Sequence, residues 1–339
     1  MTATMVWTFS QQLGHVFYFI VLPVLLLAGI GFALQRKFTL EMRTLRYLNF
    51  YFTIPCVIYA SVVTARVTPG DVGTVVLFTL AMMAAAGSLT WIVAVLRGVP
   101  KHHRNAMLMT VIFMNSGNFG LPLQSLAFRR FGLGAEARSL QAFAMITQNF
   151  ATFTLGILLA AGGGKRDSHW KQNMVHILKF PPVYALIAGI LTVQIRTWIG
   201  PESADNVLGA LRPFWEVVRH IQHAFIPLAL CTLGAQLALV RTGGKTYPIT
   251  LSVVLRLLVA PAIGVGMVYL FGLKGFLAQM LLISTSYPTA VNCMMLCLEF
   301  DNHPDFAART VFYSTLLSPV TVTAVVFLAQ SGLLPGLAI

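Results

Sequence analysis

Ten long apolar runs follow one another along the chain, and they constrain its fold more than any other feature. Each run reaches about the 20 residues that an α-helix needs to cross the hydrocarbon core of a bilayer. The polar segments between the runs are short and leave no room for a soluble domain. The sequence therefore predicts an all-α polytopic membrane protein with ten transmembrane helices, at residues 15–34, 46–64, 72–96, 105–128, 139–161, 180–198, 214–239, 249–271, 276–298 and 306–330.

The composition excludes most soluble classes of protein. Only 10% of the 339 residues are charged and 57% are apolar, whereas a soluble domain has about 25% charged residues. Nucleic-acid binders, secreted disulfide scaffolds and disordered proteins do not fit these values. The net charge of +13 is therefore expected to reflect basic cytoplasmic loops, and the expected partner is the lipid bilayer, with no nucleic acid.

The basic residues also predict an orientation. Connections on one side of the membrane carry 14 Lys and Arg residues, and those on the other side carry 7. The richer set comprises 35–46, 97–104, 162–179, 240–248 and 299–309. Because cytoplasmic loops are enriched in Lys and Arg, we expect an integral protein of the cytoplasmic (inner) or plasma membrane with both termini outside.

The two halves of the chain share an internal layout. The second run contains FTIPCVIYAS and the seventh contains AFIPLALCTLG, while the fourth contains MNSGNFGLP and the ninth STSYPTAVN. Because five is an odd number of spans, the second half enters the membrane upside down, as in many secondary transporters. We expect a first five-helix repeat at 1–161, a short cytoplasmic loop at 162–179 and a second, inverted repeat at 180–339.

Helix-breaking residues interrupt the fourth and ninth runs. Gly117 and Pro122 lie within the fourth run, and Pro288 lies within the ninth. Proline removes a backbone donor and clashes with the preceding turn, and glycine weakens the helix further. One such kink in a membrane helix is ordinarily structural. Two at matching positions of an inverted repeat favour broken helices 4 and 9 that cross at a binding site.

The predicted crossing suits an anion. Free helix N-termini carry unpaired N–H groups and a partial positive charge, and Asn side chains donate to carboxylates. All ten acidic residues fall in loops or near the ends of runs, whereas cation pumps place carboxylates inside the membrane. No cofactor is expected, and a coupling ion, sodium or proton, stays open. The candidate substrate-binding residues are Asn115, Asn118, Gly120, Ser286 and Asn292.

Two further polar residues are candidates for a supporting role. Arg256 lies some seven residues inside its run, so it either snorkels to the interface or organises the site from inside, with backbone carbonyls as partners. Gln148 is expected to face other helices and to form an interhelical hydrogen bond. His220 and His223 share a helix face but lack a third ligand, so no metal site is predicted.

Several motifs resemble those of the plant PIN-type auxin carriers. These carriers combine a GL-basic-G opening, a mid-helix proline and a Glu-aromatic-x-x-His-Pro ending, which here read GLKGFLAQMLLISTSYP at 272–288 and LEFDNHPDF at 298–306. Arg256 with Pro261, and Asn115 seven residues before Pro122, also match the family pattern. The chain thus resembles the auxin efflux carrier family, which is related in fold to the bile-acid sodium symporters.

The resemblance implies a mechanism. A scaffold domain would contain helices 1, 2, 6 and 7, and a transport domain of helices 3–5 and 8–10 would move like an elevator. Family members carry organic anions, and the PIN-type carriers are homodimers. Since the segment at 162–179 is short, the chain resembles a compact microbial member.

The leading hypothesis is a secondary-active transporter of a small organic anion, a mono- or dicarboxylate, and not an enzyme. A non-transporting membrane sensor and a passive anion channel are the alternatives.

Overall fold

The computed structural model describes residues 9–64, 68–163, 181–199, 212–240 and 247–338. These ranges are almost entirely helical and contain no β-strand. Within them, seven helices are long and apolar enough to cross a membrane: Leu13–Phe38, Met42–Thr64, Pro69–Leu96, Gly134–Gly162, Arg212–Ala238, Pro248–Leu270 and Pro304–Gln330. The prediction of an all-α polytopic membrane protein is confirmed, whereas the count of ten membrane helices stays a prediction.

Three of the apolar runs are not among these seven helices. The runs at 105–128 and 276–298 are each interrupted, so neither forms one continuous helix. The run at 180–198 forms a helix of 19 residues, Pro181–Ile199, which carries Gln194 and Arg196 near its end.

Short π-helical turns join several of the α-helices. The N-terminal elements are α1 (Phe9–Val16), η1 (Phe17–Val21), α2 (Leu22–Phe38), α3 (Met42–Tyr47), η2 (Leu48–Thr53) and α4 (Ile54–Thr64). The next are α5 (Pro69–Leu96), α6 (Lys101–Ile112), η3 (Ser116–Gly120), α7 (Leu121–Ala127), the 3-10 turn η4 (Arg129–Phe131), α8 (Gly134–Ala151), η5 (Thr152–Gly156) and α9 (Ile157–Gly163). The last are α11 (Pro181–Ile199), α13 (Arg212–Ala238), α14 (Tyr247–Val254), η6 (Leu255–Val259), α15 (Ala260–Leu270), α16 (Gly275–Ser284), α17 (Val291–Glu299) and α18 (Pro304–Gln330).

Four of the π-turns end two residues before a proline. A proline inside an α-helix lacks a donor, and its ring clashes with the carbonyl four residues earlier. A wider π-turn at this place moves that carbonyl away from the ring, so the helix continues with a local bulge. The four prolines are Pro23, Pro55, Pro122 and Pro261, which follow η1, η2, η3 and η6.

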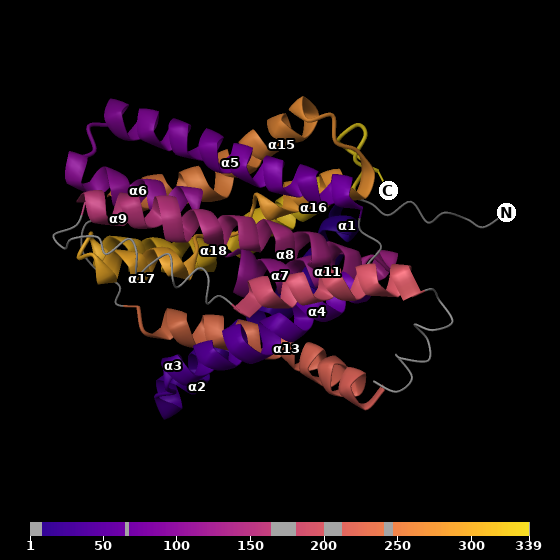
Figure 1. Cartoon of the computed structure of the whole chain (residues 1–339). Coiled ribbons are helices and arrows are strands. Elements are labelled where there is room, and N and C mark those ends of the chain that lie inside the picture. The colour runs from indigo at the N-terminus through magenta and orange to yellow at the C-terminus, as the bar shows by residue number, and fades with distance from the viewer. Residues whose placement is uncertain (1–8, 65–67, 164–180, 200–211, 241–246, 339) are drawn as a thin grey trace.

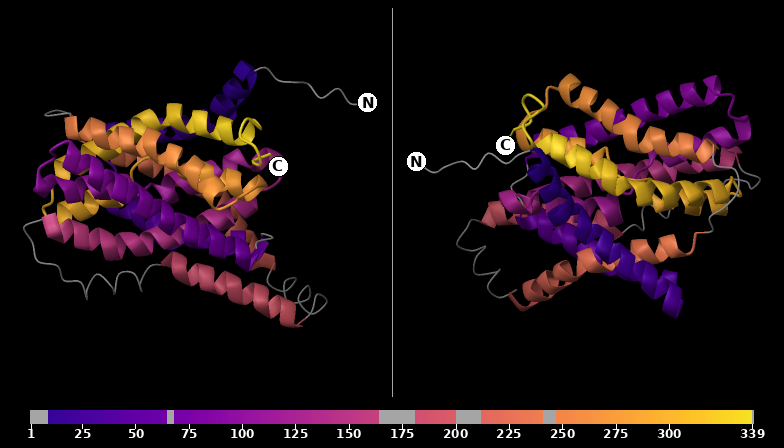
Figure 2. Two further views of the ribbon diagram at one scale, coloured as in Figure 1. Left: turned by 90° about the horizontal axis from the view of Figure 1, so that it is seen from above. Right: turned by 180° about the vertical axis from the view of Figure 1, so that it is seen from behind.

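The helices form two groups in space (Figure 1). The helices α2, α4, α11 and α13 lie together along one edge of the molecule, and α5, α6, α8, α9 and α15–α18 form the thicker body beside them. In the first group, packing joins helices that are distant in sequence: α13 packs against α2, and α11 packs against α4. The second view of Figure 2 shows α2 and α13 crossing below the helices of the C-terminal part.

The crossing of α2 and α13 depends on two glycines. A Cβ atom at Gly31 would lie 2.0 Å from the carbonyl oxygen of Cys231, and one at Gly234 would lie 1.8 Å from that of Ala28. Any larger residue would therefore push the two backbones apart. Such close approach of small residues is typical of helix packing in membranes, where dispersion contacts between backbones replace the hydrophobic effect.

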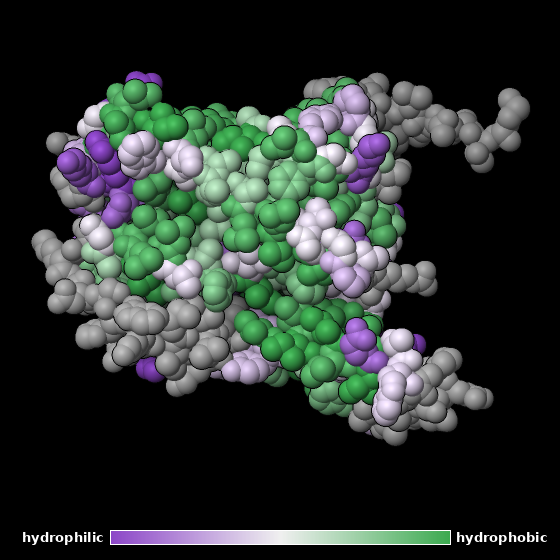
Figure 3. All heavy atoms as spheres, turned by 45° about the horizontal axis from the view of Figure 1, so that its top comes forward, coloured by the Kyte–Doolittle hydropathy of each residue, from purple (hydrophilic) through white to green (hydrophobic). Residues whose placement is uncertain are grey.

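The outer surface of the molecule fits a lipid environment. Figure 3 shows apolar side chains covering the middle of the visible face, with hydrophilic residues gathered toward its two ends. Large apolar side chains are exposed on several helices, among them Leu96, Trp198 and Leu270. In a soluble protein such a continuous apolar surface would mark an aggregation-prone patch, so the surface is consistent with an integral membrane protein.

Both predicted interruptions are present in the backbone. The helix of the fourth run ends at Ile112, and a new helix begins with η3 at Ser116. The helix of the ninth run ends at Ser284, and the next begins at Val291. The first interruption precedes Gly117 and Pro122, because η3 accommodates the proline within the second helix. The second contains Pro288 itself.

Candidate functional site

The two interrupted segments pair with each other. The N–H of Asn115 donates to the carbonyl of Pro288 over 2.8 Å, and the N–H of Ala290 donates to the carbonyl of Phe113 over 2.9 Å. Between these bonds, Met114 and Thr289 form an antiparallel bridge. Extended backbone at membrane depth persists only where protein or water satisfies its polar groups. Here each broken segment satisfies some of the backbone polar groups of the other.

Arg256 completes this arrangement from η6. Its guanidinium donates from Nε to the carbonyl of Tyr287 (2.8 Å), from Nη1 to that of Val111 (3.0 Å) and from Nη2 to that of Thr285. Val111 belongs to the last turn of α6, and the other two carbonyls follow the end of α16. The positive charge thus lies at the negative ends of two helices, where cations are stabilising.

The position of Arg256 distinguishes between the two roles that the sequence leaves open, snorkelling to the membrane interface and organising the site from inside. The side chain is 3% exposed, so it does not snorkel to the membrane interface. Its partners are the backbone carbonyls at the breaks, as expected for a buried guanidinium that pairs with no carboxylate among the described residues.

Other side chains donate to further carbonyls around the breaks. Thr289 Oγ1 donates to the carbonyl of Thr110 over 2.8 Å. Gln148 Nε2 donates to the carbonyl of Met114, which is the interhelical use predicted for this residue. In addition, Gln141 Nε2 donates to the carbonyl of Ser116 over 3.2 Å. Because buried backbone groups are costly when unpaired, these polar residues allow the helices to stay broken.

Two polar atoms at the first break have no hydrogen-bond partner among the described residues. Asn115 Nδ2 and Asn118 Oδ1 are buried without a hydrogen bond, and each residue is 7% exposed. Asn115 directly precedes η3, and Asn118 lies within it, so both stand at the start of the second half-helix. Other buried amides among the described residues, such as Gln124 and Gln148, have an unpaired oxygen, but Asn115 is the amide whose donor nitrogen is unpaired. A buried donor without an acceptor calls for an explanation such as a ligand.

Two other predicted site residues are engaged in packing. A Cβ atom at Gly120 would lie 2.6 Å from Cε2 of Tyr287, so the glycine makes room for this ring. The hydroxyl of Ser286 is fully buried and donates to the carbonyl of Ile283 over 2.7 Å. In this conformation neither residue presents a polar group to an open space.

Asn292 lies at the start of α17, where it approaches a residue that sequence reasoning missed. Its Nδ2 is 3.4 Å from Oδ1 of the buried Asn149 on α8. Asn149 follows Gln148 within an apolar run, and this polar pair was the signal that could have identified it. Tyr287, whose hydroxyl donates to Gln141 Oε1 over 3.2 Å, gives no comparable signal because aromatic residues are ordinary in membrane helices.

The space beside the crossing is small. A crevice of about 10 Å³ is lined by Arg256, Met114 and Thr285 together with residues of α5, which is about the volume that one water molecule needs. No group of three His, Cys, Asp or Glu side chains that could hold a metal ion occurs in the described parts of the chain.

Comparison with known proteins identifies a family and several relatives of this chain. The model of a family described as membrane transport protein matches residues 16–326. An "Uncharacterized transporter" of Methanothermobacter thermautotrophicus is 26% identical over 308 residues, which is 89% of this chain and 95% of that protein. A protein of Rhizobium meliloti named "Putative malonate transporter" is 27% identical over 230 residues, which is 65% of this chain and 66% of that protein.

Proposed function

The chain belongs to the membrane transport protein family that includes the auxin efflux carriers, and from this premise we propose that it is an elevator-type secondary-active carrier of a small organic anion. The family membership predicted from the motifs is thereby confirmed, as is the absence of an enzyme function. The anion bears a carboxylate, and its site lies at the crossing of the two broken helices.

The unpaired amide of Asn115 carries the proposal. It is a hydrogen-bond donor, it is buried, and no group among the described residues accepts from its Nδ2. A carboxylate oxygen is a strong acceptor for such a donor. Binding of the anion would therefore supply an acceptor for Nδ2 of Asn115.

The helix ends around the crossing also favour a negatively charged ligand. Arg256 occupies the carbonyl ends of α6 and α16. The N–H groups of Asn115 and Ala290 are bonded across the crossing, and the helices that start after these two residues direct their N-terminal ends to the same place. Neither of these helix starts has a side-chain cap. Helix N-termini favour anions through their N–H groups and their partial positive charge. Broken membrane helices that direct their N-termini at an anionic substrate are a known transporter device.

The positions of the acidic residues support an anion over a cation. Among the described residues, Asp71, Glu136 and Asp305 lie in the first turns of their helices, and Glu299 ends α17. No described carboxylate contributes a hydrogen bond at the crossing. The relative from Rhizobium meliloti, named for malonate, supports a small carboxylate as the substrate class.

Reciprocal packing supports the ten-helix inverted repeat. The first helix of the first half (α2) packs on the second helix of the other half (α13), and α11, the first of the second half, packs on α4, the second of the first. The two breaks likewise exchange hydrogen bonds in both directions. An inverted two-fold axis would produce this exchange of partners.

We assign α2, α4, α11 and α13 to the scaffold domain and the remaining membrane helices to the transport domain. The substrate-binding residues proposed on this basis are Asn115, Asn118 and Asn292, with Gly120 and Ser286 as packing neighbours that become accessible only if the transport domain rearranges.

Calorimetry on the purified protein tests the binding site, using a panel of monocarboxylates and dicarboxylates that includes malonate. Saturable flux of a bound compound into liposomes would then establish a carrier. Binding without flux would indicate the sensor alternative, and conductance that does not saturate would indicate a channel. Failure of every carboxylate to bind would contradict the proposed substrate class.

The oligomeric state is a separate proposal. The family resemblance implies a homodimer, so we propose that two copies associate in the membrane. The mass of the protein in lipid nanodiscs, measured by light scattering after subtraction of lipid, checks this. A mass of one chain at all protein concentrations would contradict it.

A further inference from the structure

A groove of about 550 Å³ lies on the outer surface of the molecule and shares Met83 and Ile112 with the crevice beside the crossing. Its walls are formed by α5 and α6, and η5 and α9 close its far side. The residues that define this α5–α6 groove are Ala84, Gly87, Ser88 and Trp91 of α5 and Leu108 and Ile112 of α6. Its volume is within the range of about 300–1,000 Å³ that is typical of ligand pockets.

Small residues create the groove. Ala84, Gly87 and Ser88 recur at helical spacing on one face of α5, where the neighbouring turns carry Leu77 and Trp91. A Cβ atom at Gly87 would lie 3.0 Å from Cδ1 of Ile112, so the glycine forms the floor against α6. Larger side chains at these three positions would fill the groove, as they do elsewhere on the exposed face of the helix.

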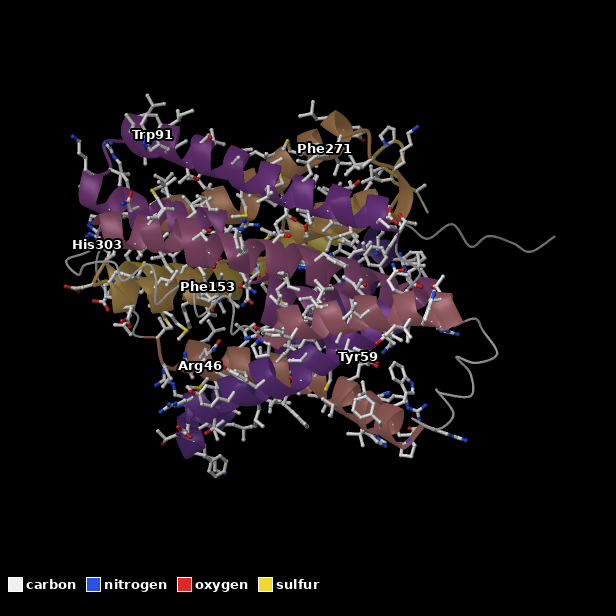
Figure 4. All side chains as sticks on the ribbon, viewed as in Figure 1. Arg46, Tyr59, Trp91, Phe153, Phe271 and His303 are labelled. Atoms are coloured by element: carbon white, nitrogen blue, oxygen red, sulfur yellow. The ribbon has the colours of Figure 1, made fainter. Side chains whose placement is uncertain are left out.

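Basic residues surround one end of the groove. Arg97 follows the last residue of α5, and Lys101 begins α6, and both are exposed. Arg104 lies one turn before Leu108, so these two residues share a face of α6. Its Nε donates to the carbonyl of Val99 over 2.8 Å, which holds the side chain at the turn between the helices. Figure 4 shows Trp91 at this same end of α5.

From this arrangement we propose that the α5–α6 groove binds one acyl chain of an anionic glycerophospholipid, whose phosphate lies against Arg97, Lys101 and Arg104. The apolar walls match the acyl chain, and the basic turn matches the phosphate. Trp91, 54% exposed, fits the interfacial level between them, where Trp side chains are enriched. Clusters of basic residues directly beside membrane helices select anionic lipids over zwitterionic ones.

The charge at this end of the molecule is not uniform. The segment between α17 and α18 carries Asp301, and Glu299 and Asp305 flank it. This segment approaches the start of α6, because His103 and His303 stack with ring centroids 3.7 Å apart. These acidic residues belong to α17, to α18 and to the segment between them, whereas the described parts of α6, η5 and α9 carry none.

Native mass spectrometry of the full chain in mild detergent tests the proposal. The probes are dioleoyl phosphatidylglycerol and dioleoyl phosphatidylcholine, which share acyl chains and differ in charge. We expect the wild-type protein to retain phosphatidylglycerol at least about tenfold better. Replacing Arg97 or Lys101 with Gln should weaken this retention about fivefold each, from the usual contribution of one basic residue.

Groove-filling variants separate the acyl chain from the headgroup. Ser88→Trp should abolish retention of phosphatidylglycerol, while Leu77→Trp, on the same exposed face two turns before Ala84, should retain it. Ala84→Leu is a smaller filling change for use if Ser88→Trp lowers the melting temperature. Equal retention of the two lipids, or normal retention by folded Ser88→Trp, would overturn the proposal. Stabilisation by inorganic phosphate equal to that by phosphatidylglycerol would also overturn it, since it would show a simple anion site at the turn.

Discussion

The backbone N–H of Asn115 donates to the carbonyl of Pro288 over 2.8 Å, which ties the break in one helix to the break in another 173 positions later. The side-chain amide of the same residue takes no part in this bond, and its Nδ2 has no partner within the described parts of the chain. Asn115 therefore separates two roles: its backbone maintains the crossing, and its side chain is available for a ligand. Substitutions at this position can test binding while the architecture is retained.

Replacing Asn115 with Ala should weaken carboxylate binding about ten- to a hundredfold. A hydrogen bond to a charged group contributes about 1.5–3 kcal/mol, which corresponds to this change in affinity. Asn115→Leu, which removes the donor and adds bulk in a buried position, should abolish flux while the protein still reaches the membrane. Calorimetry and liposome flux with a substrate identified beforehand provide both measurements.

The matched control is a second buried asparagine outside the crossing. Asn302 is fully buried and donates from Nδ2 to the carbonyls of Leu159 and Ala160. Asn302→Ala should lower the melting temperature without changing substrate affinity. If Asn115→Ala and Asn302→Ala both bind the substrate as tightly as the wild-type protein, the site is elsewhere.

The two-glycine contact between α2 and α13 can be tested within one helix. Gly31→Ala should destabilise the protein strongly, because the new Cβ would lie 2.0 Å from a backbone oxygen that cannot move independently. Gly29→Ala, whose Cβ would meet nothing within 4 Å, should be neutral or stabilising by up to about 1 kcal/mol, since Ala favours a helix. Melting temperatures in one detergent compare the two variants; equal melting temperatures would refute the close crossing.

The breaks could be located from the sequence because their residues are unusual for their surroundings. Asn115, Gly117 and Pro122 stand in an apolar run where polar and helix-breaking residues are rare, and the same holds for Pro288. The local details could not be predicted. Whether a proline interrupts a helix or is accommodated by a π-turn depends on packing against neighbouring helices, and Pro122 is accommodated.

The partners at the crossing were beyond the reach of sequence reasoning. Arg256 lies seven residues from the start of its run, and at this depth the side chain can either reach the membrane interface or point into the interior of the protein. Asn149 and Tyr287 contribute through contacts made between distant helices, which a single sequence does not specify. The α5–α6 groove could be predicted only in part. The helical spacing of Ala84, Gly87 and Ser88 is visible in the sequence, but the sequence does not show that α6 packs against this face.

Cysteine labelling tests the orientation in the membrane. In a background whose four native cysteines are replaced with Ala, single cysteines are introduced at Ser10 and, outside the described residues, at Ser168. The excess of basic residues in the loops that include 162–179 predicts that the cysteine at position 10 reacts with an impermeant thiol reagent in intact cells. The cysteine at 168 should react only after the membrane is opened. The reverse pattern would show the opposite orientation.

Replacing Arg256 with Leu should impair both folding and flux, because it leaves the carbonyls of Val111, Thr285 and Tyr287 without their donor. Each buried polar group left unpaired costs about 1–3 kcal/mol, and the negative ends of two helices lose their counter-charge. Arg256→Ala should regain part of its melting temperature in millimolar guanidinium, which can occupy the vacated position.

The control is Arg219→Leu. This change removes an exposed ion pair in which Nη2 of Arg219 lies 2.7 Å from Oε2 of Glu216, and it should change stability by less than about 1 kcal/mol. Normal melting and flux in Arg256→Leu would show that the three carbonyls are satisfied without the guanidinium.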